Sequence, residues 1–288
     1  MSSKIIVKGY QIGRKIDQIG LRTIYQGLEI RTGKEVFITV ISVRPGRSMD
    51  ILTKRAIQSK KIYMPRLVTA ISHGLTLDGQ FYYVHQATPS FPITQVLSEI
   101  PNENERLFTQ IRFFVELLET VDYLHEAGTT HRDLSTIQVR IDQKFHVLLE
   151  GFVNARPRLE ARNVLNVVNL PYISPEQLSG SPADVKTDVY SLGVIFFELI
   201  TGVLPYRSNF AKTEDMREGV VPSPSMHKMD VPPEIEAMTL KALAPRASRY
   251  ANCHEWIRDL ETFYKKRSMR MKIKDLKLSF QNIFSFRP

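Results

Sequence analysis

Residues 131–139 read His-Arg-Asp-Leu-Ser-Thr-Ile-Gln-Val, and the rest of the chain takes its register from this stretch. Before it, apolar side chains recur at helical spacing from Leu107 to Val121, and Gly128 supplies the left-handed residue that commonly ends a helix. After it, two apolar runs within residues 139–149 flank a polar turn, which predicts a hairpin. The chain thus places the acid of the first stretch on a loop between a long helix and a short pair of strands.

Later stretches add the features of one protein family in order and spacing. Residues 174–176 read Ser-Pro-Glu, and residues 188–199 are apolar nearly all round, as in a helix enclosed by protein. Arg249 follows them. Together with His-Arg-Asp at 131–133, these features resemble the eukaryotic-type (Hanks-type) Ser/Thr protein kinases over about residues 8 to 264. The resemblance implies an α+β, protein-kinase-like fold with two lobes, a small, mostly antiparallel β N-lobe and a mainly helical C-lobe.

The predicted elements follow the order of such a fold. Strand-like runs fill residues 8–86 and are interrupted by a helical stretch near residues 49–62. Residues 87–92 contain two prolines and are interpreted as a hinge. We therefore expect an N-lobe over residues 1–86, a C-lobe over residues 87–264 and a basic tail over residues 265–288.

Composition predicts the compartment. The 288 residues are 43% hydrophobic, enough for a full core, and the lone Cys253 excludes an intrachain disulfide and favours a reducing environment. The N-terminal apolar run is too short for a signal peptide, and no run of 18 apolar residues exists. We expect a soluble, cytoplasmic protein.

The net charge of +9 is concentrated in the basic tail. Residues 265–288 hold eight Lys and Arg and one acid, which leaves +2 for the rest of the chain. Nucleic acid is therefore not an expected partner. Apolar residues in the tail fit a helix or a strand, so the tail either packs on the body or contacts an anionic membrane or an acidic partner.

The resemblance assigns the phosphate-covering loop to residues 16–25, and none of its three glycine positions holds glycine. Family members use glycine there because a missing β-carbon lets backbone N–H groups approach the phosphates. The three positions hold Asp17, Ile19 and Arg22, and the carboxylate of Asp17 would repel phosphate.

The residues that would hold ATP also differ from the family pattern. The resemblance places the family lysine at Thr39 and its glutamate partner at Arg55. Phe37 stands where a methyl group covers adenine, and Arg140 stands beneath it. Because close-packed interiors rarely accommodate such additions, we expect the pocket to be filled.

Both magnesium ligands implied by the resemblance are lengthened. Gln138 replaces an asparagine, and Glu150 replaces the aspartate of Asp-Phe-Gly. Mg²⁺ demands near-octahedral geometry at about 2.1 Å, so two longer ligands are a poor combination. Tyr172 is the only hydroxyl-bearing residue between positions 153 and 173, so the usual loop phosphorylation has no evident acceptor.

The residues that hold the helical lobe together in the family are retained. The resemblance implies that Asp188 accepts hydrogen bonds from backbone amides of the His-Arg-Asp loop and that Glu176 pairs with Arg249 in a partly buried position. Asp133 is then interpreted as a hydrogen-bonded loop residue rather than a catalytic base. The predicted structural residues are His131, Arg132, Glu176, Asp188 and Arg249.

We therefore predict a pseudokinase with a degenerate ATP-binding site and with no catalytic residue, metal or cofactor. It would be a signalling scaffold or allosteric regulator that binds another protein, either an active kinase or its substrate. One alternative is a weak or unconventional Ser/Thr kinase, with Asp133 as base, ATP and Mg²⁺ on Gln138 and Glu150, and Arg22 replacing the lysine as in the with-no-lysine kinases. The other is an adaptor tethered to membrane or polyanion through its basic tail.

Overall fold

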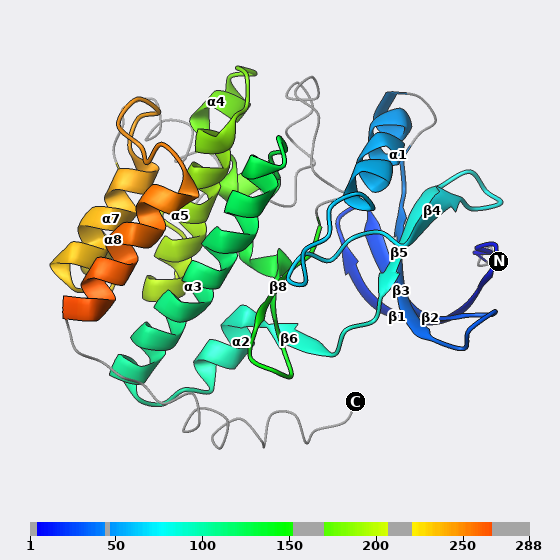
Figure 1. The fold of residues 1–288 in the computed structure, drawn as a ribbon, viewed down its shortest axis with the longest axis horizontal. Helices are drawn as coiled ribbons and strands as arrows, with labels where there is room; N and C mark the ends of the chain where they lie inside the picture. Colours follow the sequence, from blue (N-terminus) through cyan, green and yellow to red (C-terminus); the bar gives the residue numbers. More distant parts are fainter. Residues whose placement is uncertain (1–4, 44–46, 152–169, 207–220, 267–288) are drawn as a thin grey trace. The chain divides into compact units, whose positions relative to one another are not determined.

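The computed structural model describes residues 5–43, 47–151, 170–206 and 221–266 (Figure 1). The chain divides into two compact units. The N-terminal unit comprises Met1–Pro89 and Glu150–Val168, and the C-terminal unit comprises Ser90–Leu149 and Asn169–Pro288. The basic tail beyond Lys266 lies outside the described residues, so its predicted helix or strand remains an expectation.

A five-stranded antiparallel sheet forms the N-terminal unit, in the order β1-β2-β3-β5-β4 (Figure 1). Two residues, Gly20 and Leu21, join β1 to β2, and Gly20 adopts a positive φ of 57° that glycine tolerates without steric cost. Helix α1 (Arg47–Ser59) follows β3. The strands are β1 (Tyr10–Ile19), β2 (Arg22–Glu29), β3 (Glu35–Ile41), β4 (Ser72–Leu75) and β5 (Phe81–Gln86).

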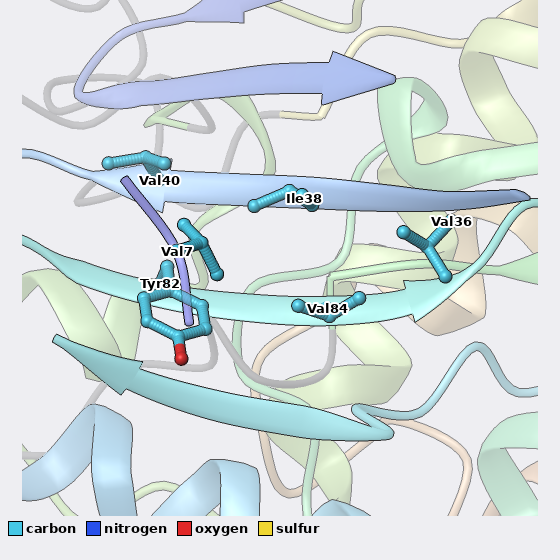
Figure 2. Packing of buried hydrophobic residues seen from close by; sticks show 6 residues of the cluster. All are labelled: Val7, Val36, Ile38, Val40, Tyr82 and Val84. Carbon is cyan, nitrogen blue, oxygen red and sulfur yellow. The ribbon is translucent and has the colours of Figure 1, made fainter. Parts of the chain in front are cut away.

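Strand β3 supplies side chains to both faces of this sheet because successive residues of a strand point to opposite sides. Figure 2 shows the cluster on one face, whose members are Val7, Val36, Ile38, Val40, Tyr82 and Val84. The other face packs against α1 through a second cluster, which consists of Ile41, Ala56, Ala70, Phe81 and Tyr83. By the same alternation, Phe37 and Thr39 lie on this second face.

The C-terminal unit is mainly helical (Figure 1). Its three-stranded sheet has the order β6 (Ser90–Pro92), β7 (Val139–Asp142) and β8 (Val147–Leu149). Its α-helices are α2 (Ile93–Ser98), α3 (Glu103–Glu126), α4 (Pro175–Leu178), α5 (Val185–Thr201), α7 (Pro233–Leu243) and α8 (Cys253–Lys266). Single 3₁₀ turns are η1 (Thr136–Gln138), η4 (Leu170–Tyr172) and η5 (Pro224–Met226).

Helix α5 is the centre of the C-terminal unit. Every residue from Thr187 to Phe197 is buried, and α5 packs against α3 and α7. Phe196 of α5 stacks on Phe114 of α3 with ring centroids 4.3 Å apart, and both rings meet Trp256 of α8 nearly edge-on. The all-round apolar sequence of α5 therefore has a direct cause, since protein surrounds the helix.

The structure confirms the predicted α+β class. The helical stretch expected near residues 49–62 is α1, and the predicted hairpin is β7 with β8. Strand β4 was not predicted, and β6 lies within the segment interpreted as a hinge. Helices α2, α7 and α8 were anticipated only in the general expectation of a mainly helical C-lobe. No helix among the described residues is both long and apolar enough to cross a membrane.

Candidate nucleotide and catalytic site

The N-terminal residues assigned to phosphate and adenine share one face of the sheet. Residues directly opposite each other on antiparallel strands point to the same side. Asp17 pairs with Ile24, and Ile24 pairs with Thr39, so Asp17 and Thr39 lie on that side. Arg22 is two residues from Ile24 on β2, and Phe37 is two residues from Thr39 on β3, so both side chains lie on the same face.

Aromatic rings fill the part of this face around Phe37. The Phe37 ring is half-buried and meets the ring of His85, its cross-strand partner on β5, edge-on with centroids 5.6 Å apart. His85 in turn stacks on Tyr83 at 5.9 Å. Three aromatic rings therefore gather around Phe37, the residue that the sequence resemblance assigns to the adenine pocket.

Thr39, to which the sequence resemblance assigns the position of the family lysine, is buried. Its side chain is 1% exposed, and its hydroxyl has no hydrogen-bond partner within the described part of the chain. Strand β3 contains no Lys or Arg that could replace the missing cation. The basic residue of β2 on this face is the half-buried Arg22. It pairs with Ile41, which is two residues from Thr39 on β3.

The predicted phosphate loop is a plain two-residue hairpin turn. Ile19 and Arg22 form the last backbone pair before the turn. Asp17 is exposed, and its Oδ1 accepts a hydrogen bond from the Gln18 amide at 2.7 Å. Arg55, to which the sequence resemblance assigns the position of the family glutamate, is half-buried on α1.

In the C-terminal unit, Asp188 of α5 organises the loop that follows α3. Its Oδ2 accepts the His131 amide and its Oδ1 accepts the Arg132 amide, both at 2.7 Å. The Nε2 atom of His125 lies 2.9 Å from Oδ2. Burial alone would raise the pKa of Asp188, but hydrogen bonding and the two neighbouring histidines hold this pKa below its ordinary value. The loop is thus fixed with Arg132 at a positive φ of 66°.

Asp133 lies buried on this loop beside Gln138. The Gln138 Nε2 donates to Asp133 Oδ2 at 3.3 Å, and the Asp133 amide lies 3.4 Å from His131 Nδ1. The structure therefore brings together a predicted base and one predicted metal ligand.

One side-chain atom of this loop, Gln138 Oε1, is suited to bind Mg²⁺. The Oε1 atom of Gln138 is buried without a hydrogen-bond partner among the described residues, and an amide oxygen is a ligand that Mg²⁺ accepts. The second predicted ligand, Glu150, directly follows β8 and belongs to the N-terminal unit. The geometry within the C-terminal unit therefore fits one protein ligand, and Phe152 beyond Glu150 lies outside the described residues.

Arg140 is held against strand β6. Arg140 belongs to β7 and pairs with Pro92 of β6. Its Nε donates to Ser90 Oγ at 2.9 Å, and its Nη2 donates to the Ser90 carbonyl at 2.7 Å. These two bonds fix the guanidinium at the position that the resemblance places beneath adenine.

The Glu176–Arg249 ion pair is buried. Arg249 Nη1 donates to Glu176 Oε1 at 2.7 Å, and the two side chains are 1% and 7% exposed, respectively. Arg249 also donates to the Ala244 carbonyl, and its guanidinium lies 4.7 Å from the centre of the Tyr190 ring. Glu176 also accepts a hydrogen bond from Thr187 Oγ1. The ion pair joins α4 to the segment before α8.

Tyr172 is unsuited to act as a phosphate acceptor in this structure. The residue is buried, its hydroxyl donates to Glu198 Oε2 at 2.6 Å, and it lies 2.8 Å from Thr136 Oγ1. Burial raises the pKa of Tyr172, and the Glu198 carboxylate raises it further. Asn169, to which the resemblance assigns the position of a family threonine that supports the catalytic aspartate, lies outside the described residues.

Sequence reasoning missed three residues that support the loop. His125 reaches Asp188, and Gln177 donates from Nε2 to the Arg132 carbonyl at 3.0 Å. Glu198 accepts from Tyr172. The spacing Ser174-x-x-Gln177 is a capping-box pattern, which the structure contains and which the sequence could have revealed. The other two contacts join residues far apart in the chain and leave no local signal.

Comparisons with known proteins add the wider context. A family model described as protein kinase domain matches residues 10–272. The chain is 27% identical to a probable serine/threonine-protein kinase PknB of Lactococcus lactis, over 90% of this chain and 42% of that protein. It is also 27% identical to a serine/threonine-protein kinase PknL of Mycobacterium bovis, over 91% of this chain and 67% of that protein. The chain spans about half, or less, of the length of the first relatives it matches.

Solved structures agree at the level of the fold. The crystal structure of the Mycobacterium tuberculosis PknI kinase domain superposes with a TM-score of 0.71 at 18% identity, over 91% of this chain and 99% of that chain. At this identity the likeness shows the two-lobed fold alone.

Proposed function

Because this chain belongs to the protein kinase family, we propose that it is a pseudokinase, which acts by binding another protein rather than by transferring phosphate. It would serve as a scaffold or allosteric regulator in signalling, with an active kinase or a kinase substrate as its partner. No cofactor is part of this proposal, and the expected location is the cytoplasm.

The buried Thr39 carries the proposal. Phosphoryl transfer depends almost entirely on positioning the phosphates and neutralising their charge, and the β3 lysine is one of the groups that does so. Here a hydroxyl with 1% exposure replaces that lysine. The neighbouring Phe37 and His85 rings give the same face an aromatic surface.

Arg140 supports the same conclusion from the C-terminal unit. Its two hydrogen bonds to Ser90 hold a charged group where family members present an aliphatic floor to adenine. An adenine ring placed there would meet a charged guanidinium in place of an apolar side chain.

A phosphoryl-transfer assay tests the proposal. The full chain is incubated with Mg²⁺ and γ-labelled ATP, alone and with a generic acceptor protein, beside the Asp133→Asn variant. We expect no incorporation that depends on Asp133. Incorporation that Asp133→Asn abolishes would contradict the proposal.

A weak Ser/Thr kinase is the second candidate, and two observations favour it. Arg22 shares a sheet face with Thr39 one row away, so it lies on the side from which a replacement cation would act. Gln138 keeps a buried amide oxygen free while its NH₂ group donates to Asp133. A kinase of this kind would use Asp133 as base and Gln138, with Glu150, for Mg²⁺.

Charge removal on the two faces of the β1–β2 hairpin separates the candidates. Lys15 pairs with Tyr25, and Tyr25 pairs with Ile38 of β3. Ile38 points to the face opposite Thr39, so Lys15 lies on the face opposite Arg22. The weak kinase requires Mg²⁺-dependent ATP binding that Arg22→Ala abolishes and Lys15→Ala preserves. Equal behaviour of the two variants would remove the second candidate.

A further inference from the structure

Three side chains with metal-binding atoms meet where the end of α3 lies against the start of α8. Asp122 and His125 stand three residues apart on α3 and so share a helix face, and Cys253 is the first residue of α8. Their ligand atoms all lie within 4.8 Å of one another. Cys253 Sγ and His125 Nδ1 are 4.0 Å apart. All three residues belong to the C-terminal unit.

Asp188 holds the His125 ring from the side opposite Cys253. Its side chain is 5% exposed, and its Nε2 lies 2.9 Å from the Asp188 carboxylate, which can only accept a hydrogen bond. A hydrogen bond to this carboxylate uses Nε2 as the donor, which leaves Nδ1 as the ring nitrogen that faces Cys253. A carboxylate bound to the far nitrogen is the arrangement that orients metal-ligating histidines in proteins.

The distance between Cys253 Sγ and His125 Nδ1 is close to the value expected for two ligands of one zinc ion. With Zn–S near 2.3 Å and Zn–N near 2.05 Å, tetrahedral geometry places sulfur and nitrogen about 3.5 Å apart. The observed 4.0 Å requires a movement of only a few tenths of an ångström. The same distance lies at the outer limit for a thiol hydrogen bond, so direct bonding between Cys253 and His125 explains the arrangement poorly.

The set of donor atoms selects the metal. One sulfur, one imidazole nitrogen and one carboxylate oxygen suit Zn²⁺ and exclude Mg²⁺ or Ca²⁺ as the natural occupant, since those ions prefer oxygen ligands. Cys253 is the only cysteine of the chain and is fully buried, so it cannot form an intrachain disulfide. Asp122 is half-buried and provides the side from which an ion would enter.

We propose that Asp122, His125 and Cys253 form a zinc site at the junction of α3 and α8, with three protein ligands and a fourth position for water. Binding involves no redox change. The thiol of Cys253 releases its proton to solvent as the sulfur–zinc bond forms, while Asp122 binds as a carboxylate and His125 as a neutral ring.

Asp188 connects this site to the loop that carries Asp133. Its Oδ2 is shared between His125 Nε2 and the His131 amide, and its Oδ1 accepts the Arg132 amide. An ion bound to Nδ1 makes the opposite N–H of His125 a stronger donor and so tightens its bond to Asp188. The bound ion would therefore stabilise the His131–Asp133 loop, whether or not the loop is catalytic.

Cobalt substitution tests the site on the full chain. Chelator-treated protein is titrated with Co²⁺, and we expect one equivalent to produce the near-ultraviolet charge-transfer band of a thiolate–cobalt bond. Zn²⁺ should displace the cobalt and, at about 100 times its Kd, raise the melting temperature by roughly 5–10 °C.

Matched variants decide the outcome. Cys253→Ala should abolish the band, and Asp122→Asn, a change at a half-buried position that keeps the fold, should weaken zinc binding by more than about 100-fold. His254→Gln is the control, because His254 is adjacent to Cys253 in the chain but exposed. Absence of the band, or equal zinc affinity in the unaltered, Asp122→Asn and His254→Gln proteins, would overturn the proposal.

Discussion

Two arginines three residues apart, Arg246 and Arg249, carry ion pairs of opposite exposure. Arg249 is 1% exposed and pairs with the buried Glu176, whereas Arg246 is 40% exposed and pairs with Asp184 at 2.5 Å. Arg249→Met leaves a buried carboxylate without its partner, so we expect a loss of about 3–5 kcal/mol in the free energy of unfolding. Urea denaturation followed by circular dichroism measures this loss.

Arg246→Met is the control for that experiment. A solvent-exposed pair is screened by water and salt, and its removal should cost about 0–1 kcal/mol. Losses of equal size in the two variants would show that the burial of the Glu176–Arg249 pair does not determine its contribution.

At the scale of single residues, the sequence showed which residues are unusual for the family, but it did not show which other residues they contact. The unusual Thr39, Phe37 and Arg140 were found by their positions relative to a family pattern. The two bonds from Arg140 to Ser90 were not, because they depend on the pairing of β6 with β7. The ring contact between Phe37 and His85 likewise follows from the β3–β5 register, which no local pattern specifies.

Helices α5 and α7 approach each other at Gly193. A β-carbon added there would lie 2.9 Å from Leu243 Cδ2 and 3.1 Å from Ala242 Cβ. Alanine in a helix interior normally stabilises by about 1 kcal/mol relative to glycine, but overpacking a core costs about 1–3 kcal/mol. We expect Gly193→Ala to lower the melting temperature, because the steric cost is the larger of the two.

A double-variant cycle checks that explanation. Leu243→Val shortens the side chain that the new methyl group would meet, so the combined variant should lose less stability than the two single variants added together. Additive losses would show that the α5–α7 contact is not the cause.

Among the secondary-structure elements, length and pattern decided which were predictable. Helices α3 and α5 carry long apolar patterns, and β3 and β5 are rich in β-branched and aromatic residues. Strands β4 and β6 have four and three residues, respectively, too few for an alternating pattern to appear. Their existence depends on tertiary pairing with β5 and β7.

Three buried tyrosines give the molecule a defined response to alkaline pH. Burial raises the pKa of Tyr172, Tyr190 and Tyr250, and nearby carboxylates raise those of Tyr172 and Tyr250 further. A folded pKa above the unfolded value of 10.0 contributes stability that is present below pH 10 and is lost as pH rises toward the folded pKa. We expect these three residues to ionise only as the C-terminal unit unfolds.

Ultraviolet titration with parallel circular dichroism measures this coupling. Tyr172→Phe and Tyr250→Phe should each reduce the part of the tyrosinate signal that appears together with the loss of helix. A reduction confined to the signal that precedes unfolding would show that these hydroxyls ionise in the folded protein.

For the whole molecule, the sequence predicted the fold more completely than the activity. The family model matches residues 10–272, and α5 at the centre of the C-terminal unit is buried along most of its length. Activity in the protein kinase family depends on a few side chains around the nucleotide, and such side chains can change while the fold stays the same. Fold and chemistry are therefore separate properties of this chain.

The most direct measurement is the melting temperature of the full chain with and without millimolar Mg²⁺-ATP. A ligand at 100 times its Kd adds about 2.7 kcal/mol, a rise of roughly 5–10 °C. Tyr25→Ala is the control for Phe37→Ala, because Tyr25 is a half-buried ring on the opposite face of the same sheet. We expect no rise for the unaltered protein or for Tyr25→Ala, and a rise confined to Phe37→Ala would show that the Phe37 ring blocks a latent site. A clear rise for the unaltered protein would contradict the proposed loss of nucleotide binding.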